Sequence, residues 1–104
     1  MKRMMCLASF LAISVGAARA QAVGDPQKGL ALAQQVCSKC HAIRRGEDRP
    51  KDSLAPTFPE LATTPGMTST ALSVALMTPH AGMPMFTFTA EERDDVIAYF
   101  LSLR

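Results

Sequence analysis

The stretch Cys37-Ser38-Lys39-Cys40-His41 determines how the rest of the sequence is interpreted. Two residues separate the two cysteines, and a histidine follows the second cysteine directly. Upstream, Asp25-Pro26 is a good start for a helix, because Asp accepts hydrogen bonds from unpaired N–H groups and Pro suits the first helical position. Apolar residues then recur at helical spacing, at Leu30, Ala33 and Val36. The sequence therefore predicts a helix that begins after Asp25 and ends at the cysteines.

A C-x-x-C pair has three ordinary interpretations. A redox dithiol of the thioredoxin type normally follows a strand in a βαβ unit, for which the sequence shows no pattern. A zinc site needs four ligands, and His80 is the only other histidine. A structural disulfide is permitted in an exported protein. The histidine directly after Cys40 favours a fourth interpretation, in which the thiols of Cys37 and Cys40 bind covalently to one haem and His41 coordinates its iron.

The first 20 residues have the pattern of a secretory signal peptide. Two basic residues open it, an apolar run follows at residues 4–18, and it ends in Ala18-Arg19-Ala20. The run is shorter than the roughly 20 apolar residues that span a membrane, so we expect cleavage rather than an anchor. This interpretation divides the chain into a signal peptide (1–20) and one exported domain (21–104).

Composition constrains that domain further. The chain has 11 Lys and Arg against 9 Asp and Glu, and 3 of the basic residues lie in the first 20, so the domain carries 8 basic and 9 acidic residues. This balance gives no support to nucleic-acid binding. A domain of 84 residues (104 less 20) buries a modest core and is often stabilised by a metal, a disulfide or a cofactor.

The remaining segments also predict helices. A short helical turn is expected at 59–62, and a longer helix begins at Thr68 and ends before Pro79. The longer helix has one apolar face, made by Ala71, Leu72, Ala75 and Leu76. Thr89 and Glu92 form a capping-box pattern at the start of the last helix. Its apolar face comprises Val96, Ile97, Tyr99, Phe100 and Leu103. Since no segment alternates like a strand, we expect an all-α domain with long loops.

A six-coordinate iron needs a second axial ligand, and the residues alone leave several candidates. They are His80, Met67, Met77, Met83 and Met85. Met77 on a predicted helix and Met67 in a turn suit packing, whereas Met83 and Met85 flank Pro84 in the loop before the last helix. A thioether ligand is soft and raises the reduction potential relative to a second histidine.

The sequence resembles the class I cytochrome c family over essentially the whole predicted domain. The matching features are Gly24-Asp25…Gly29, the C-x-x-C-H motif, a late Met-Pro pair and Ile97-Ala98-Tyr99…Leu101. The resemblance implies a small all-α fold with three main helices wrapped around one covalent haem c. It also implies that the first and last helices cross at close range, with Gly29 against Val96 and Tyr99.

The same resemblance implies roles for individual residues. Cys37 and Cys40 would hold the haem, and His41 would be one axial ligand of its iron. Met83, the methionine that precedes a proline, would be the other axial ligand. The carbonyl oxygen of Pro56 would accept a hydrogen bond from the ring of His41 and orient it.

An iron with two protein ligands has no open position for a substrate, so the resemblance implies an electron carrier and not an enzyme. Such a periplasmic carrier would take one electron from a dehydrogenase and pass it to an oxidase or reductase. A cluster of basic residues around the motif has two interpretations, steering of an acidic partner or an ordinary solvated loop: Lys39, Arg44, Arg45, Arg49 and Lys51. We expect a monomer, with no nucleic-acid partner and no stable membrane insertion after cleavage. The alternatives are the haem subunit of a larger periplasmic dehydrogenase and a ligand-binding or peroxidase-like protein with an open sixth position.

Overall fold

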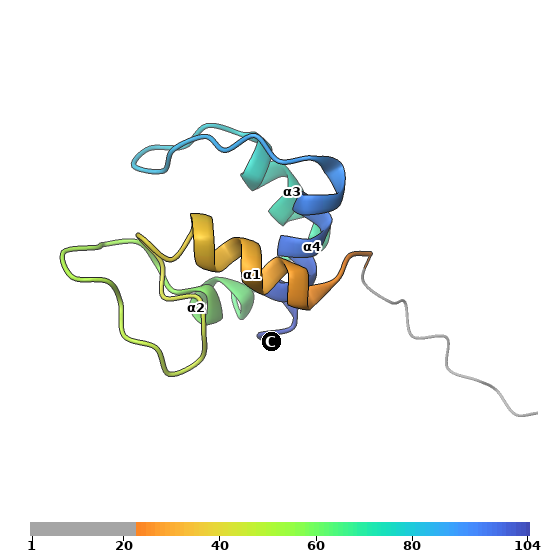
Figure 1. Cartoon of the computed structure of the whole chain (residues 1–104). Helices are drawn as coiled ribbons and strands as arrows, with labels where there is room; N and C mark the ends of the chain where they lie inside the picture. Colours follow the sequence, from red (N-terminus) through yellow and green to blue (C-terminus); the bar gives the residue numbers. More distant parts are fainter. Residues whose placement is uncertain (1–22) are drawn as a thin grey trace, which may run out of the picture.

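The computed structural model describes residues 23–104, so the predicted signal peptide lies outside the described residues. The chain forms four helices in the order α1 (Pro26–Val36), α2 (Phe58–Ala62), α3 (Ser69–Met77) and α4 (Ala90–Leu101) (Figure 1). Within residues 23–104 there is no strand, and an isolated bridge pairs His80 with Met83. The prediction of an all-α domain with three main helices is therefore confirmed.

The side chains that start α1, α3 and α4 are the ones that the sequence predicts, whereas the capping box that starts α2 was not predicted. Oδ1 of Asp25 accepts hydrogen bonds from the N–H groups of Gln27 and Lys28, at 2.8 and 3.3 Å, and Pro26 is the first residue of α1. Thr68 caps α3 in the same way. Reciprocal capping boxes begin α2, from Thr57 and Glu60, and α4, from Thr89 and Glu92. Local hydrogen bonding thus fixes where each helix begins.

Helices α1 and α4 cross in close contact at Gly29. A Cβ atom at this position would overlap the backbone carbonyl of Asp95 and lie 2.9 Å from Cβ of Tyr99. The contact with Tyr99 is the predicted one, but the nearest backbone belongs to Asp95 rather than to Val96. Oδ1 of Asp95 also accepts a hydrogen bond of 2.6 Å from the N–H of Asp25. Asp95 is 6% exposed, so this carboxylate is part of the crossing and not of the surface.

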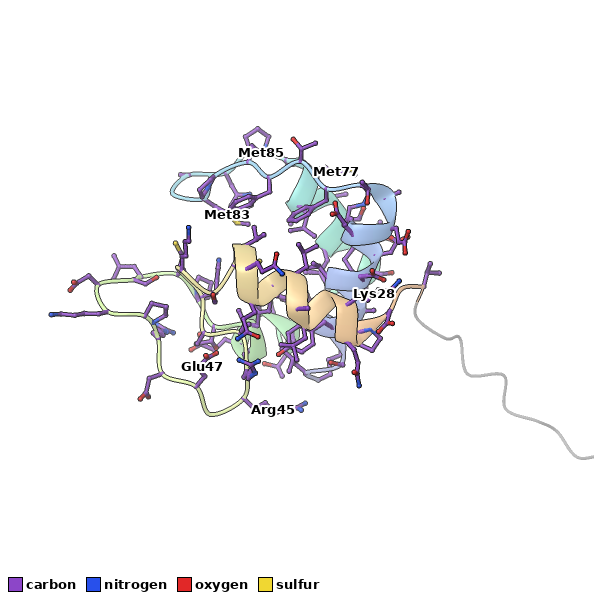
Figure 2. The ribbon with its side chains drawn as sticks, viewed as in Figure 1. Lys28, Arg45, Glu47, Met77, Met83 and Met85 are labelled. Atoms are coloured by element: carbon purple, nitrogen blue, oxygen red, sulfur yellow. The ribbon has the colours of Figure 1, made fainter. Side chains whose placement is uncertain are left out.

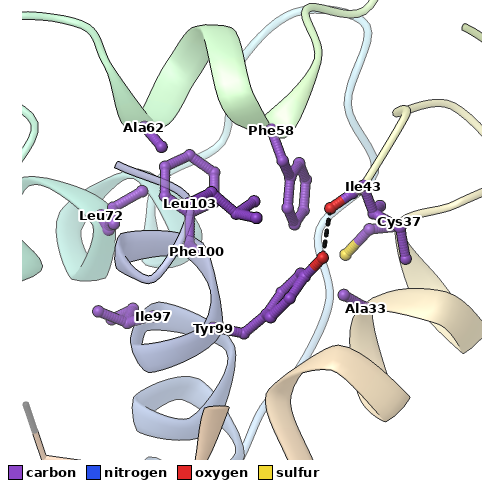
Figure 3. Packing of buried hydrophobic residues seen from close by; sticks show 10 residues of the cluster. All are labelled: Ala33, Cys37, Ile43, Phe58, Ala62, Leu72, Ile97, Tyr99, Phe100 and Leu103. Atoms are coloured by element: carbon purple, nitrogen blue, oxygen red, sulfur yellow. Dashed lines mark hydrogen bonds between the residues drawn. The ribbon is translucent and has the colours of Figure 1, made fainter. Parts of the chain in front are cut away.

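The apolar core lies beside this crossing and joins α2, α3 and α4 to the end of α1 (Figure 3). The rings of Phe58 and Phe100 pack with centroids 4.9 Å apart. The hydroxyl of Tyr99 donates a hydrogen bond of 2.6 Å to the carbonyl of Ile43, so α4 also fixes the segment after the cysteines. The predicted apolar face of α4 is buried as expected. The predicted face of α3 was partly wrong, because Leu72 is buried but Ala75 is exposed.

We expect Gly29→Ala to lower the free energy of unfolding of the haem-loaded protein by about 1–3 kcal/mol, because the added methyl group overlaps the backbone of α4. Chemical denaturation measures this loss. Gln35→Ala, at an exposed position of the same helix, is the control and should change stability by less than about 0.5 kcal/mol. If Gly29→Ala were as stable as the wild type, the close crossing would be wrong, since alanine is otherwise the better helix former.

Candidate functional site

The cysteine motif forms a tight turn directly after α1. The N–H of Cys37 donates to the carbonyl of Ala33 at 2.8 Å. The N–H groups of Cys40 and His41 both donate to the carbonyl of Cys37, at 3.2 and 3.0 Å. The thiol of Cys37 is buried, that of Cys40 is exposed, and both cysteines are free. Three chemically reactive side chains are therefore held within one turn of backbone.

The surroundings of the cysteines argue against two of the alternative interpretations, the redox dithiol and the zinc site. Burial raises the pKa of its thiol to about 11, whereas a redox dithiol needs a thiolate near neutral pH. In residues 23–104 no three side chains from His, Cys, Asp and Glu are grouped so that they could hold a metal ion. The described part of the chain thus lacks the four-ligand cluster of a structural zinc site.

His41 is held in one ring orientation by the loop that follows the motif. Its Nδ1 lies 2.6 Å from the carbonyl oxygen of Pro56, and its ring packs against Phe58 with centroids 5.5 Å apart. A carbonyl oxygen only accepts, so in the neutral ring Nδ1 carries the proton and Nε2 has the free lone pair. This is the arrangement in which an imidazole binds a metal ion. The family resemblance predicts that His41 pairs with Pro56, and the structure brings these two residues together.

The candidates for the second axial ligand lie in different surroundings. Met67 packs against the core, and Met77 is 53% exposed with Sδ 3.4 Å from Nη1 of Arg93. Met85 is also 53% exposed, whereas Met83 is half-buried. Sδ of Met83 lies 3.0 Å from Nε2 of His80.

Met83 and Met85 belong to the loop of residues 78–88, which connects α3 to α4. In Figure 1 this loop extends to the same side of the molecule as the C-terminal end of α1. Figure 2 shows Met83 and Met85 on this loop and Met77 at the end of α3. Met83 and Met85 therefore lie on the side of the molecule where the cysteine turn ends.

Two contacts that hold the site were not predicted. Oγ of Ser53 donates to the carbonyl of Cys40 and thereby fastens the loop before Pro56 to the motif. Oε2 of Glu47 accepts hydrogen bonds from the N–H groups of Ile43 and Arg44, at 2.7 and 3.0 Å. Both are bonds between a side chain and a distant or irregular backbone segment, for which the sequence carries no periodic signal.

Some of the basic residues near the motif form hydrogen bonds or ion pairs that the sequence does not indicate. Arg49 forms an ion pair of 2.7 Å with Glu60, Arg44 donates to Gln34, and Arg45 donates to the carbonyl of Arg104. Lys39 and Lys51 are exposed. The arginines thus have structural partners within the domain, and the two lysines present their charge to solvent.

Comparison with known proteins identifies the family of this chain. No curated protein and no solved structure matches it significantly. No helix in the described residues is long and apolar enough to cross a membrane. Residues 24–100 match the family described as cytochrome c oxidase, cbb3-type, subunit III. Because this match covers most of the 104 residues, the chain belongs to that family and is a small class I-like c-type cytochrome domain, which implies electron transfer on haem.

Proposed function

We propose that this chain is an exported, periplasmic cytochrome c that carries one electron at a time on a single haem c. Cys37 and Cys40 bind the haem covalently, and His41 and Met83 are the axial ligands of its iron. The observation that carries the proposal is the hydrogen bond of 2.6 Å from His41 to Pro56, beside two free thiols. It leaves Nε2 of His41 with the lone pair that a metal ion binds.

The donor set fits a haem of the c type. Two unpaired thiols on one turn suit covalent attachment, and an oriented imidazole suits one axial position. A half-buried thioether at Met83 suits the other and favours ferrous iron. When bound, the haem supplies the one-electron couple of its iron. Covalent attachment also stabilises a domain whose core is small.

The residues around the site explain why electron transfer, and not catalysis, is proposed. Pro56 and Phe58 hold the ring of His41. Met83 would supply the second protein ligand of a bound haem iron. An iron with both positions filled exchanges electrons through the edge of its haem and binds no substrate. Leu54 is 95% exposed and lies two residues from Pro56, so an apolar contact for a redox partner is available beside the site.

A second candidate is a haem subunit of a larger redox complex. The description of the matched family, a subunit of an oxidase, favours it, as do the exposed apolar side chains of Leu54 and Met85. Size-exclusion chromatography of native material separates the two. A free carrier elutes at the size of one domain, and a subunit elutes with its partners.

We expect the purified protein to be coloured, with a mass equal to the polypeptide plus one haem and one haem per chain in a pyridine haemochrome assay. Cys37→Ser and His41→Ala should each lose most of this haem, because each removes an attachment or a ligand. Ser38→Ala, inside the same motif, is the matched control and should keep it. A colourless wild-type protein with the mass of the bare peptide, from a host that attaches haem c, would contradict the proposal.

Met83 and Met85 are distinguished by their optical spectra. The ferric wild type should show the weak band near the red end of the spectrum that marks an iron–thioether bond, and the ferrous protein should not bind carbon monoxide readily. Met85→Leu should keep the band because Met85 is exposed. Met83→Leu should abolish it. Loss of the band in Met85→Leu alone would make Met85 the ligand instead.

If Lys39 and Lys51 steer anionic partners, the oxidation rate of the reduced protein by hexacyanoferrate(III) should fall as ionic strength rises. The double variant Lys39→Gln/Lys51→Gln should slow this reaction by up to about tenfold at low salt and flatten its salt dependence. Lys28→Gln, at the far end of α1, is the control and should have little effect. A rate that is independent of ionic strength in the wild type would exclude steering.

A further inference from the structure

One metal-binding side chain near Met83 has no role in the function proposed above. It is His80, which lies in the loop of residues 78–88. Its Nδ1 is 3.0 Å from the carbonyl oxygen of Thr78. Since a carbonyl only accepts, Nδ1 carries the proton of the neutral ring and Nε2 has the free lone pair. His80 is therefore held by the backbone in the same way as His41 is held by Pro56.

The free nitrogen of His80 faces the sulfur of Met83. Nε2 and Sδ are 3.0 Å apart, and the N–H of Met83 donates to the carbonyl of His80 at 3.3 Å. Gly82, with φ at 79°, provides the left-handed conformation that closes this turn. In the neutral ring Nε2 and Sδ are both lone-pair donors, and neither can hydrogen-bond to the other. Nε2 of His80 and Sδ of Met83 therefore lie in one turn, where either of them can bind the same metal ion when the other does not.

We propose that His80 is an alternative sixth ligand for the iron that His41 and Met83 hold. When the thioether of Met83 leaves, Nε2 of His80 takes its position. One iron–sulfur bond would break and one iron–nitrogen bond would form. The oxidation state of the iron would not change, and the neutral tautomer with its proton on Nδ1 has no proton to lose from Nε2. This proposal rests on the function proposed above.

The exchange would keep the sixth position filled. The iron would remain low-spin and closed to small ligands, and its reduction potential would be lower because imidazole replaces thioether. Both donors come from one turn outside the helices, so α1 and α4 need not move. Loss of the thioether would therefore convert one electron carrier into another, rather than into a protein with an open site.

The test compares haem-loaded Met83→Leu with the double variant Met83→Leu/His80→Asn. Met83→Leu should lose the band near the red end but stay low-spin. The double variant should be high-spin, and its ferrous form should bind carbon monoxide at least about tenfold more tightly, the factor expected if His80 occupies the position nine-tenths of the time. Imidazole added to the double variant should restore the low-spin spectrum. His80→Asn alone should keep the band, because Met83 remains the first ligand.

Two results would overturn the proposal. One is equal carbon monoxide affinity in the single and double variants, with both high-spin. The other is a red-end band that survives in Met83→Leu, which would assign the replacement to Met85. If leucine at position 83 prevents haem retention, Met83→Ala gives the same comparison. Failure of the proposed function itself is distinct, because it is seen in the wild type, as a missing haem or a missing band.

Discussion

The crossing of α1 and α4 at Gly29 is the contact on which the position of the site depends. Without a side chain at Gly29, the backbone of α1 lies directly against Asp95 and Tyr99. The carboxylate of Asp95 fixes the start of α1 through the N–H of Asp25. The far end of the same helix carries the cysteine turn, so the angle of the crossing determines where the two thiols and His41 lie. The hydroxyl of Tyr99 extends this control to the segment that follows the motif.

The ring of His41 is positioned by a second layer of contacts that depends on this frame. The loop before Pro56 is fastened to the motif through Ser53, and Phe58 joins the ring of His41 to the core through Phe100. The site is thus assembled from a helix end, an irregular loop and one short helix. Each of these elements contacts the cysteine motif or the ring of His41, and burial of Cys37 follows from the same packing.

Local signals in the sequence predicted most of the fold. Asp25, Thr68 and Thr89 begin their helices because their side chains bind N–H groups within three residues, a range that a sequence displays directly. Thr57 starts α2 in the same way but was not predicted. The burial of Asp95 was not predicted, because a charged residue on a helix is normally exposed and its partner is 70 residues away. The C-x-x-C-H motif alone predicted covalent haem attachment, whereas the pairing of His41 with Pro56 was predicted from the family resemblance. The contact between His80 and Met83 depends on a turn around Gly82, and the amino-acid composition of this loop does not specify the shape of that turn.

The crossing of α1 and α4 also makes some parts of the protein more stable against local unfolding than others. It joins residues 70 positions apart, and closing such a loop costs on the order of 4 kcal/mol in chain entropy. Loss of the crossing would release both the loop with Pro56 and the loop with Met83, because each connects elements that the crossing holds. The reverse does not follow: the loop of residues 78–88 can open while α1 and α4 stay packed. Hydrogen exchange should then resolve two cooperative units, a slowly exchanging helix pair and a faster loop of residues 78–88, so Met83, the proposed second ligand, belongs to the part of the molecule that opens first.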